Sequence, residues 1–320
     1  GAKRGKSARA WKESGMIWKK WFGRIAAGFA AIGLMGSAAA REAPRSHVAA
    51  EAVARPGLWR LRDKDTTIYL FGTIHALPAD MKWRTPAFDA AFRSADQLMI
   101  EIGNIDDTQA VGAELLKAGI AQGLPPLLER VPEAKRPALK AAMAKSGYPT
   151  ALFNEMKSWM AAVLLLNVTM QEIGLDAERG AERPLVAEWK AKGGKAEGFE
   201  TAAEQFGFLN GLSPEGQAKF LEAAADSPEA ARKEFAGMLK AWRTGDVAGI
   251  AHTFDDETNM SAELRDVLMR KRNARWAQWL GARMGKPGTV FVAVGAGHLA
   301  GPDSVIALLG RRGLKAVRVQ

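Results

Sequence analysis

The apolar segment 289–294, Thr-Val-Phe-Val-Ala-Val, constrains the fold of this chain more than any other part of the sequence. It carries no charge, and half of its residues are valines. A short apolar run of this kind, bounded by turn-forming residues, is typical of a strand that is buried within a sheet. We therefore predict a buried strand that leads directly into Gly295-Ala296-Gly297-His298.

Further apolar stretches predict strands, and these alternate with segments of helical periodicity. We expect strands at 58–62, 68–71, 98–100, 193–199 and 316–319. We expect short helices at 87–93 and 302–311, and mostly helical structure over about 108–190 and 202–284. Strands that alternate with helices predict an α/β fold with a mainly parallel central sheet, helices packed around it, and a large helical insertion in the middle of the chain.

Most of the formal charge of +10 lies in the first forty residues. Residues 1–40 contain eight Lys or Arg side chains and one Glu, a net charge of +7, which leaves +3 for residues 41–320. With so little net charge, residues 41–320 have no strong attraction for phosphate backbones, so we expect no nucleic-acid partner. The composition, with 48% hydrophobic and 25% charged residues, excludes a mainly disordered or polytopic membrane protein.

Residues 1–40 have the pattern of a secretory signal peptide. The basic residues are followed by an Ala/Gly-rich apolar run at 25–40, whose last residues predict cleavage after Ala40. A retained membrane anchor is the alternative, although this run is shorter than the roughly 20 residues that span a bilayer. We expect a linker at 41–56 and one domain at 57–320.

The chain contains no cysteine, which excludes disulfides, thiolate metal ligands and a cysteine nucleophile. Together with the predicted signal peptide, this composition fits a bacterial periplasmic or secreted protein whose stability depends on its core. We expect contact with a membrane only if the N-terminal segment is not cleaved.

An apolar strand followed by Gly-x-x-His occurs twice in the sequence. The first copy is Gly72-Thr73-Ile74-His75, and the second is Gly295-Ala296-Gly297-His298. Glycine lets the backbone turn sharply after a strand, and it removes a side chain that would block approach to the imidazole. The repeat therefore predicts the same local geometry for two of the four histidines in the chain.

Four predicted strands end on, or turn directly into, a residue that can do chemistry: His75, Glu101, Glu200 and His298. Ligands of open α/β sheets bind beyond the carboxyl ends of the strands, so we expect these side chains to meet there. Two imidazoles and a carboxylate are the ligands of many catalytic metal sites. The alternatives are structural hydrogen bonds for the histidines, a helix cap or arginine pair for Glu101, and an ordinary helix start for Glu200.

Arg272 lies within an apolar stripe of the helix predicted around 261–284, which also contains Leu264, Leu268, Trp276 and Trp279. A guanidinium on an apolar face needs an anionic partner to offset its desolvation. Arg272 could hold Glu101 or stabilise a developing oxyanion, and a salt bridge at the rim of the helix is the alternative. Asn273, near the edge of the same face, could hydrogen-bond a substrate or a ligand histidine.

Other signals are weak. We expect His47, in the linker, and His252, in a polar helical region, to take no part in chemistry. The sequence lacks Gly-x-Ser-x-Gly and a complete dinucleotide-binding fingerprint, so we expect neither a serine hydrolase elbow nor a dinucleotide site.

These motifs resemble the TraB/GumN family, whose relatives include the Tiki metalloproteases. The resemblance covers about 58–319 and is carried by LWRLRDKDTTIYLFGTIHALP, QLMIEIGN, GKAEGFETAAEQ, KRNARWAQWL and VFVAVGAGHLAGPDSVIALLGRRGLKAVRV. It implies an active site made of both Gly-x-x-His motifs, an acidic residue after the second core strand, and an Arg/Asn pair. The matching positions are His75, His298, Glu101, Arg272 and Asn273, with Glu200 and Gln205 in a further family block. Ser304 departs from the glycine that many relatives have there.

We therefore expect a metal-dependent hydrolase of the cell envelope that acts on an amide, in a peptide or protein substrate. His75 and His298 would bind a divalent metal, and Glu101 would be a third ligand or the general base. Arg272 and Asn273 would stabilise or position the tetrahedral intermediate. Ligands without sulfur leave manganese, cobalt, zinc and iron open. The alternatives are metal-free hydrolysis with a histidine as base, as in an esterase, and a non-catalytic regulatory protein that captures a peptide or a haem-like ligand.

Overall fold

The computed structural model describes residues 53–320 except 79–80, 104, 176–179, 226–227 and 256–259. The predicted signal peptide and nearly all of the predicted linker, with His47, lie outside the described residues. No helix in the described part of the chain combines the length and the hydropathy needed to cross a membrane.

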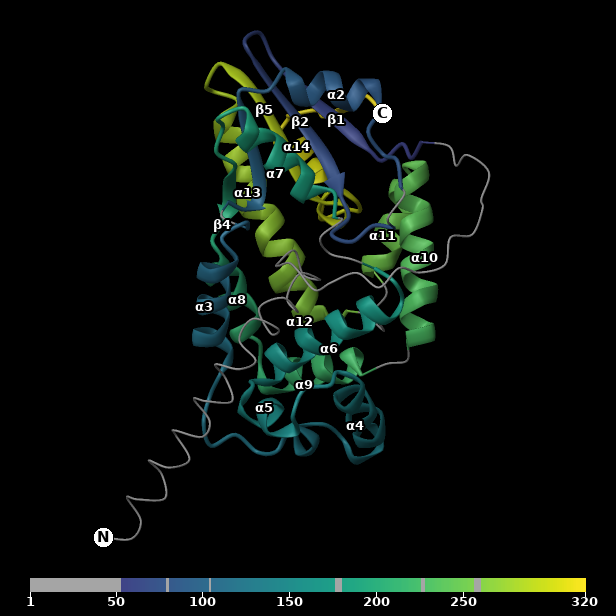
Figure 1. Cartoon of the computed structure of the whole chain (residues 1–320). Coiled ribbons are helices and arrows are strands. Elements are labelled where there is room, and N and C mark those ends of the chain that lie inside the picture. Colours follow the sequence, from purple (N-terminus) through teal and green to yellow (C-terminus); the bar gives the residue numbers. More distant parts are fainter. Residues whose placement is uncertain (1–52, 79–80, 104, 176–179, 226–227, 256–259) are drawn as a thin grey trace, which may run out of the picture.

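A six-stranded sheet forms the centre of the fold, in the order β4-β3-β5-β2-β1-β6 (Figure 1). Four strands run parallel: β2 (Thr66–Thr73), β3 (Gln97–Ile102), β4 (Glu197–Glu200) and β5 (Gly288–Gly295). At one edge, β1 (Leu58–Arg62) pairs antiparallel with β2, and β6 (Val317–Arg318) pairs antiparallel with β1. The predicted α/β fold with a mainly parallel sheet is confirmed.

Both faces of the sheet are covered by helices, as the apolar β5 requires. Phe291 and Ala293 face α2 (Pro86–Arg93) and α7 (Glu182–Ala191), together with α10 (Pro228–Thr244) and α11 (Val247–Asp255). Val290, Val292 and Val294 face α13 (Lys271–Arg283) and α14 (Val305–Arg311) on the other side. Because side chains alternate along a strand, an uninterrupted apolar run supplies both of these cores.

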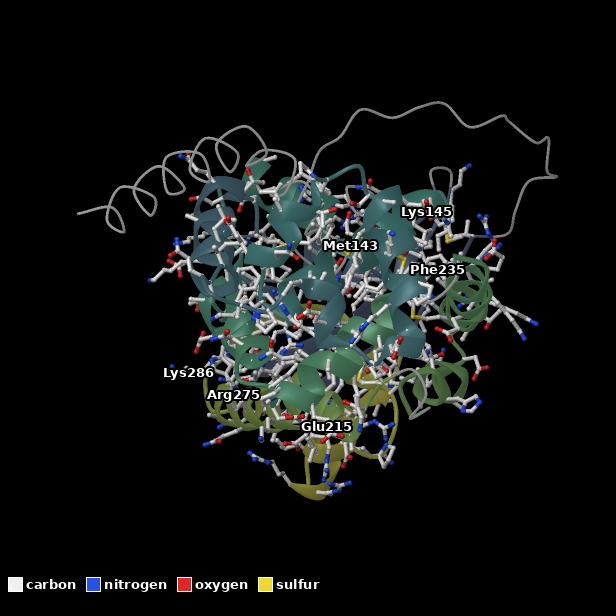
Figure 2. The ribbon with its side chains drawn as sticks, turned by 90° about the horizontal axis from the view of Figure 1, so that it is seen from below. Met143, Lys145, Glu215, Phe235, Arg275 and Lys286 are labelled. Atoms are coloured by element: carbon white, nitrogen blue, oxygen red, sulfur yellow. The ribbon has the colours of Figure 1, made fainter. Side chains whose placement is uncertain are left out.

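A third core belongs to a helical lobe beyond the carboxyl ends of the parallel strands (Figure 1). The lobe contains α3 (Thr108–Gly119), α4 (Arg136–Lys145), α5 (Thr150–Glu155), α6 (Ser158–Glu172), α8 (Ala202–Asn210), α9 (Pro214–Ala224) and α12 (Ala262–Arg265). Two short 3-10 helices, at Leu127–Arg130 and Glu133–Lys135, precede α4. Figure 2 shows Met143 of α4 among these helices, where it is buried, whereas Lys145 is exposed. The segments predicted as helical at 108–190 and 202–284 thus supply both the lobe and helices that cover the sheet.

The structure differs from the predicted boundaries in small ways. The strand predicted at 193–199 begins only at Glu197, because Gly193 has a φ of 80° and belongs to a turn. The helix predicted at 302–311 begins at Val305, after Ser304 accepts a hydrogen bond from the amide of Ala307. A π turn at Asp266–Arg270 joins α12 to α13 within the helix predicted at 261–284.

Candidate active site

The two Gly-x-x-His motifs meet at the carboxyl ends of adjacent parallel strands. Thr73 at the end of β2 pairs with Gly295 at the end of β5. A Cβ on Gly295 would lie 3.4 Å from His75 Nε2, 3.2 Å from Glu101 Oε1 and 3.6 Å from His298 Cδ2. The structure therefore brings together the two histidines and the carboxylate that the sequence predicted, around the space beside Gly295.

The glycine of the first motif has a different role. A Cβ on Gly72 would stand 3.0 Å from the Cα of Ala296, in the 3-10 helix η6 (Ala296–Leu299). Gly72 thus lets η6, which carries His298, pack directly against the end of β2. The missing side chain at Gly72 therefore permits close packing against η6. It does not serve to open access to the imidazole of His75.

Arg272 joins two buried carboxylates. Its Nη2 donates to Glu101 Oε2 at 2.7 Å, and its Nε lies 3.0 Å from both oxygens of Glu200. Burial raises the pKa of Glu101, but Arg272, the two histidines and the amide of Gly295 together outweigh burial and hold this pKa well below its ordinary value. Glu101 Oε1 also accepts the amide of Gly295 at 2.8 Å. The salt bridge predicted between Arg272 and Glu101 is therefore present, and it lies in the interior rather than at the rim.

Glu200 supports Arg272 and does not line the space around Gly295. Its side chain is 0% exposed, and one oxygen accepts from Arg275 Nη2 at 2.8 Å and from Trp276 Nε1 at 3.1 Å. Figure 2 shows Arg275 toward the outside of the molecule, and its side chain is 47% exposed. Glu200 therefore links the buried guanidinium to the protein surface. Thr201 next to it caps α8 through a capping box with Glu204.

His298 is held through both of its ring nitrogens. Nδ1 lies 2.6 Å from Asn273 Oδ1, and the amide nitrogen of Asn273 donates to the carbonyl of Asp303 at 2.9 Å. Nε2 lies 3.3 Å from Arg272 Nη1 and 3.7 Å from Glu101 Oε1. Burial, which exceeds the opposing effect of Glu101, lowers the pKa of His298 to about 3. The ring is therefore neutral at pH 7, and Asn273 positions the histidine that the sequence predicted it could hold.

His75 is paired with a carboxylate that the sequence analysis missed. Its Nδ1 lies 2.8 Å from Glu182 Oε1, and Glu182 also accepts from the hydroxyl of Thr73. Burial lowers the pKa of His75, but Glu182 and Glu101 together outweigh burial and raise this pKa to about 9. Glu182 lies on the buried stripe of α7 with Leu185, Val186 and Trp189. A charge on an apolar stripe was the signal that identified Arg272, and it could have identified Glu182.

A small pocket, partly open to solvent and with room for about one water molecule, adjoins this cluster. It is lined by His75, Ile100, Glu101, Ile102, Ile105, Glu182 and Gln205. The side chain of His75 is 29% exposed, and it is thus the more accessible of the two histidines. His252, on α11, is exposed and lies outside this cluster.

Two imidazoles and a carboxylate are side chains that can bind a divalent metal. Each histidine is held through Nδ1 by an oxygen, of Glu182 or of Asn273, which is the arrangement that orients metal-ligating imidazoles. In the described part of the chain no group of three or more His, Asp or Glu side chains is already arranged as a metal site. Arg272 contacts Glu101 and His298 at the same place. A metal held here would therefore compete with the guanidinium for both side chains.

Replacement of Arg272 by methionine should destabilise the protein by about 3–5 kcal/mol, because it leaves Glu101 and Glu200 buried with one partner fewer each. The free energy of unfolding in urea measures this loss. The matched control is Arg275→Met, which removes a half-exposed partner of Glu200 and should cost no more than about 1 kcal/mol. Equal losses in the two variants would contradict a central role for the buried guanidinium.

The comparisons with known proteins agree with the resemblance seen in the motifs. The chain is 28% identical over 247 residues to the uncharacterized protein YbaP of Escherichia coli K12, which covers 75% of this chain and 87% of YbaP. YbaP of Shigella flexneri matches to the same extent. No solved structure matches the chain. The model of the TraB/PrgY/gumN family matches residues 57–318, which include every residue of the cluster described above, and the chain therefore belongs to the TraB/PrgY/gumN family.

Proposed function

We propose that this protein is a hydrolase that cleaves an amide bond, in a peptide or protein substrate, beside the space at Gly295. The proposal rests on the convergence of His75, Glu101, His298 and Arg272 at the carboxyl end of the sheet. Burying charged groups together has a large free-energy cost, and clusters of this kind at the mouth of a pocket are typical of active sites.

A divalent metal ion completes the proposed site. Nε2 of His75, Nε2 of His298 and an oxygen of Glu101 would hold it, and manganese, cobalt, zinc and iron all accept nitrogen and oxygen ligands. When bound, such an ion lowers the pKa of a water molecule and polarises a carbonyl group.

The residues of the chain have separate roles around that chemistry. Glu182 and Asn273 fix the rings of His75 and His298. Both oxygens of Glu101 already accept hydrogen bonds, which makes it a weak base and favours a ligand role over that of a general base. Arg272 is a fixed positive charge beside the same space, where it can stabilise an oxyanion.

Metal-free hydrolysis is a second candidate, favoured by the pair of His75 and Glu182. A carboxylate that orients a histidine through Nδ1 is the arrangement by which many hydrolases position a general base or acid. His75 also lines the pocket and is its most accessible imidazole. In this candidate His75 would transfer the proton, and His298 would remain a neutral hydrogen-bonding group.

Metal analysis of the purified protein separates the candidates. We expect bound divalent metal and cleavage of a quenched-fluorescent peptide pool, and we expect EDTA to abolish cleavage. His298→Ala should weaken metal binding beyond the roughly 10–100-fold that loss of a supporting partner costs. The control is His252→Ala, which changes an exposed histidine and should alter neither property.

Three outcomes would contradict the metal site. Cleavage that survives EDTA and needs His75 would establish the metal-free candidate. Full metal content and cleavage in a folded His298→Ala variant would exclude His298 as a ligand. A tightly retained peptide or haem-like ligand without turnover would establish a binding protein.

Gly295→Ala tests the proposed reaction space directly. Gly295 has a φ of −49°, which any residue adopts, so the substitution adds only a methyl group, 3.2–3.6 Å from Glu101, His75 and His298. We expect at least a tenfold fall in cleavage, because small displacements of reacting groups have large effects on rate. Gly207→Ala is the control: Gly207 is exposed on α8, a Cβ there meets nothing within 4 Å, and cleavage should not change. Unchanged cleavage in Gly295→Ala would place the reaction elsewhere.

We propose that the protein acts in the periplasm or outside the cell, with an uncleaved N-terminal anchor as the alternative. The support is the basic and apolar pattern of residues 1–40, followed by a chain without cysteine. We expect the chain in the periplasmic fraction of a bacterial host, with a mature N-terminus at Arg41. Full-length protein in the cytoplasmic fraction would contradict this localisation.

A further inference from the structure

Gln205 is a buried polar residue whose side chain has no hydrogen-bond partner in the described part of the chain. It is 2% exposed, and its Oε1 is buried without a donor. A buried carboxamide carries one acceptor oxygen and two N–H donors, and leaving them unpaired destabilises a folded protein. In a native structure such a group calls for a partner, which can be an ordered water molecule, an ion or a ligand.

The position of Gln205 indicates which ligand that is. It lines the pocket that also contains His75, Glu101 and Glu182. The capping box at Thr201 starts α8 directly after β4, and Gln205 lies on the buried stripe of α8 with Ala202, Phe206 and Leu209. The only polar group on that stripe therefore faces the pocket of the candidate active site.

A primary carboxamide is the hydrogen-bonding complement of a peptide amide. Its oxygen accepts from the peptide N–H, and its N–H donates to the peptide carbonyl. The other residues of the pocket are three isoleucines and ionisable groups, so Gln205 is its single neutral donor and acceptor. An ester has a carbonyl but no N–H, and it would leave Oε1 of Gln205 unpaired.

We propose that Gln205 binds a backbone amide of the substrate, so that the site selects peptides over the corresponding esters. This inference rests on the proposed function, since it assigns the substrate contact of the same site. Gln205 is here a substrate-binding residue, and no proton transfer or metal contact is assigned to it.

The test compares Gln205→Met with the wild-type protein. Methionine keeps the length of the side chain and removes its polar atoms, so the unliganded variant should gain stability, with a Tm higher by about 2–4 °C. Cleavage of the quenched-fluorescent peptide pool should fall about 10- to 100-fold in kcat/KM. Wild type should prefer the peptide pool over a matched pool with one ester in each chain, and Gln205→Met should lose most of that preference.

Gln217→Met is the matched control. Nε2 of Gln217 donates to the carbonyl of Leu212 at 3.2 Å, so the substitution removes a structural hydrogen bond. It should lower the Tm slightly and leave the preference for peptides unchanged. A Gln205→Met variant that behaves like this control would overturn the proposal, and so would an unchanged preference, which would indicate that a water molecule satisfies Gln205.

A separate measurement keeps this proposal distinct from the proposed function. If wild type cleaves neither pool, the hydrolase is rejected, and retention of the same labelled peptides by the protein is measured instead. Weaker retention by Gln205→Met, with the higher Tm, would support the contact with a peptide amide without catalysis. Equal or absent retention in both proteins would overturn it.

Discussion

The bridge that Arg272 makes between two buried carboxylates is the interaction on which the rest of the site depends. One guanidinium on α13 holds Glu101 at the end of β3 and Glu200 at the end of β4, and it reaches Nε2 of His298. Each contact lies in the protein interior, away from water. Charges there interact strongly and tolerate little displacement. The bridge therefore fixes the helix against the sheet and fixes the acid and the imidazole at the same time. A ligand that binds Glu101 would therefore meet the guanidinium of Arg272, which also holds α13 against the sheet.

The strand order explains why these groups meet. β5 comes late in the sequence but inserts between β3 and β2, so its end lies between Glu101 on one side and the first Gly-x-x-His motif on the other. Helices cover both faces of the sheet, and the helical lobe lies beyond its carboxyl end. Apolar walls and buried charges are thus brought to one place by residues that are more than 200 positions apart in the chain.

The sequence predicts much of this arrangement and misses some of it for physical reasons. Apolar runs that end on His75, Glu101, Glu200 and His298 predict strands, and parallel strands place those ends together. The stripe around Arg272 predicts an anionic partner, and the structure supplies two. The periodicity of hydropathy does not reveal strand order, because it does not depend on which strands are hydrogen-bonded to each other. The sequence did not single out Glu182, because it begins a helix rather than ending a strand. The apolar stripe of α7 that contains it can nevertheless be seen in the sequence. The bounds of β4 depended on the turn at Gly193, which the alternation of residues does not show.

The late insertion of β5 has a consequence during biosynthesis. A ribosome-bound chain that ends before Gly288 contains His75, Glu101 and Arg272, yet it lacks the strand that separates and aligns their supports. Such a nascent chain leaves the edges of β2 and β3 without their shared neighbour, and it has no His298. A chain that stops before Gly288 therefore lacks both β5 and His298, so the candidate site cannot assemble until translation is nearly finished.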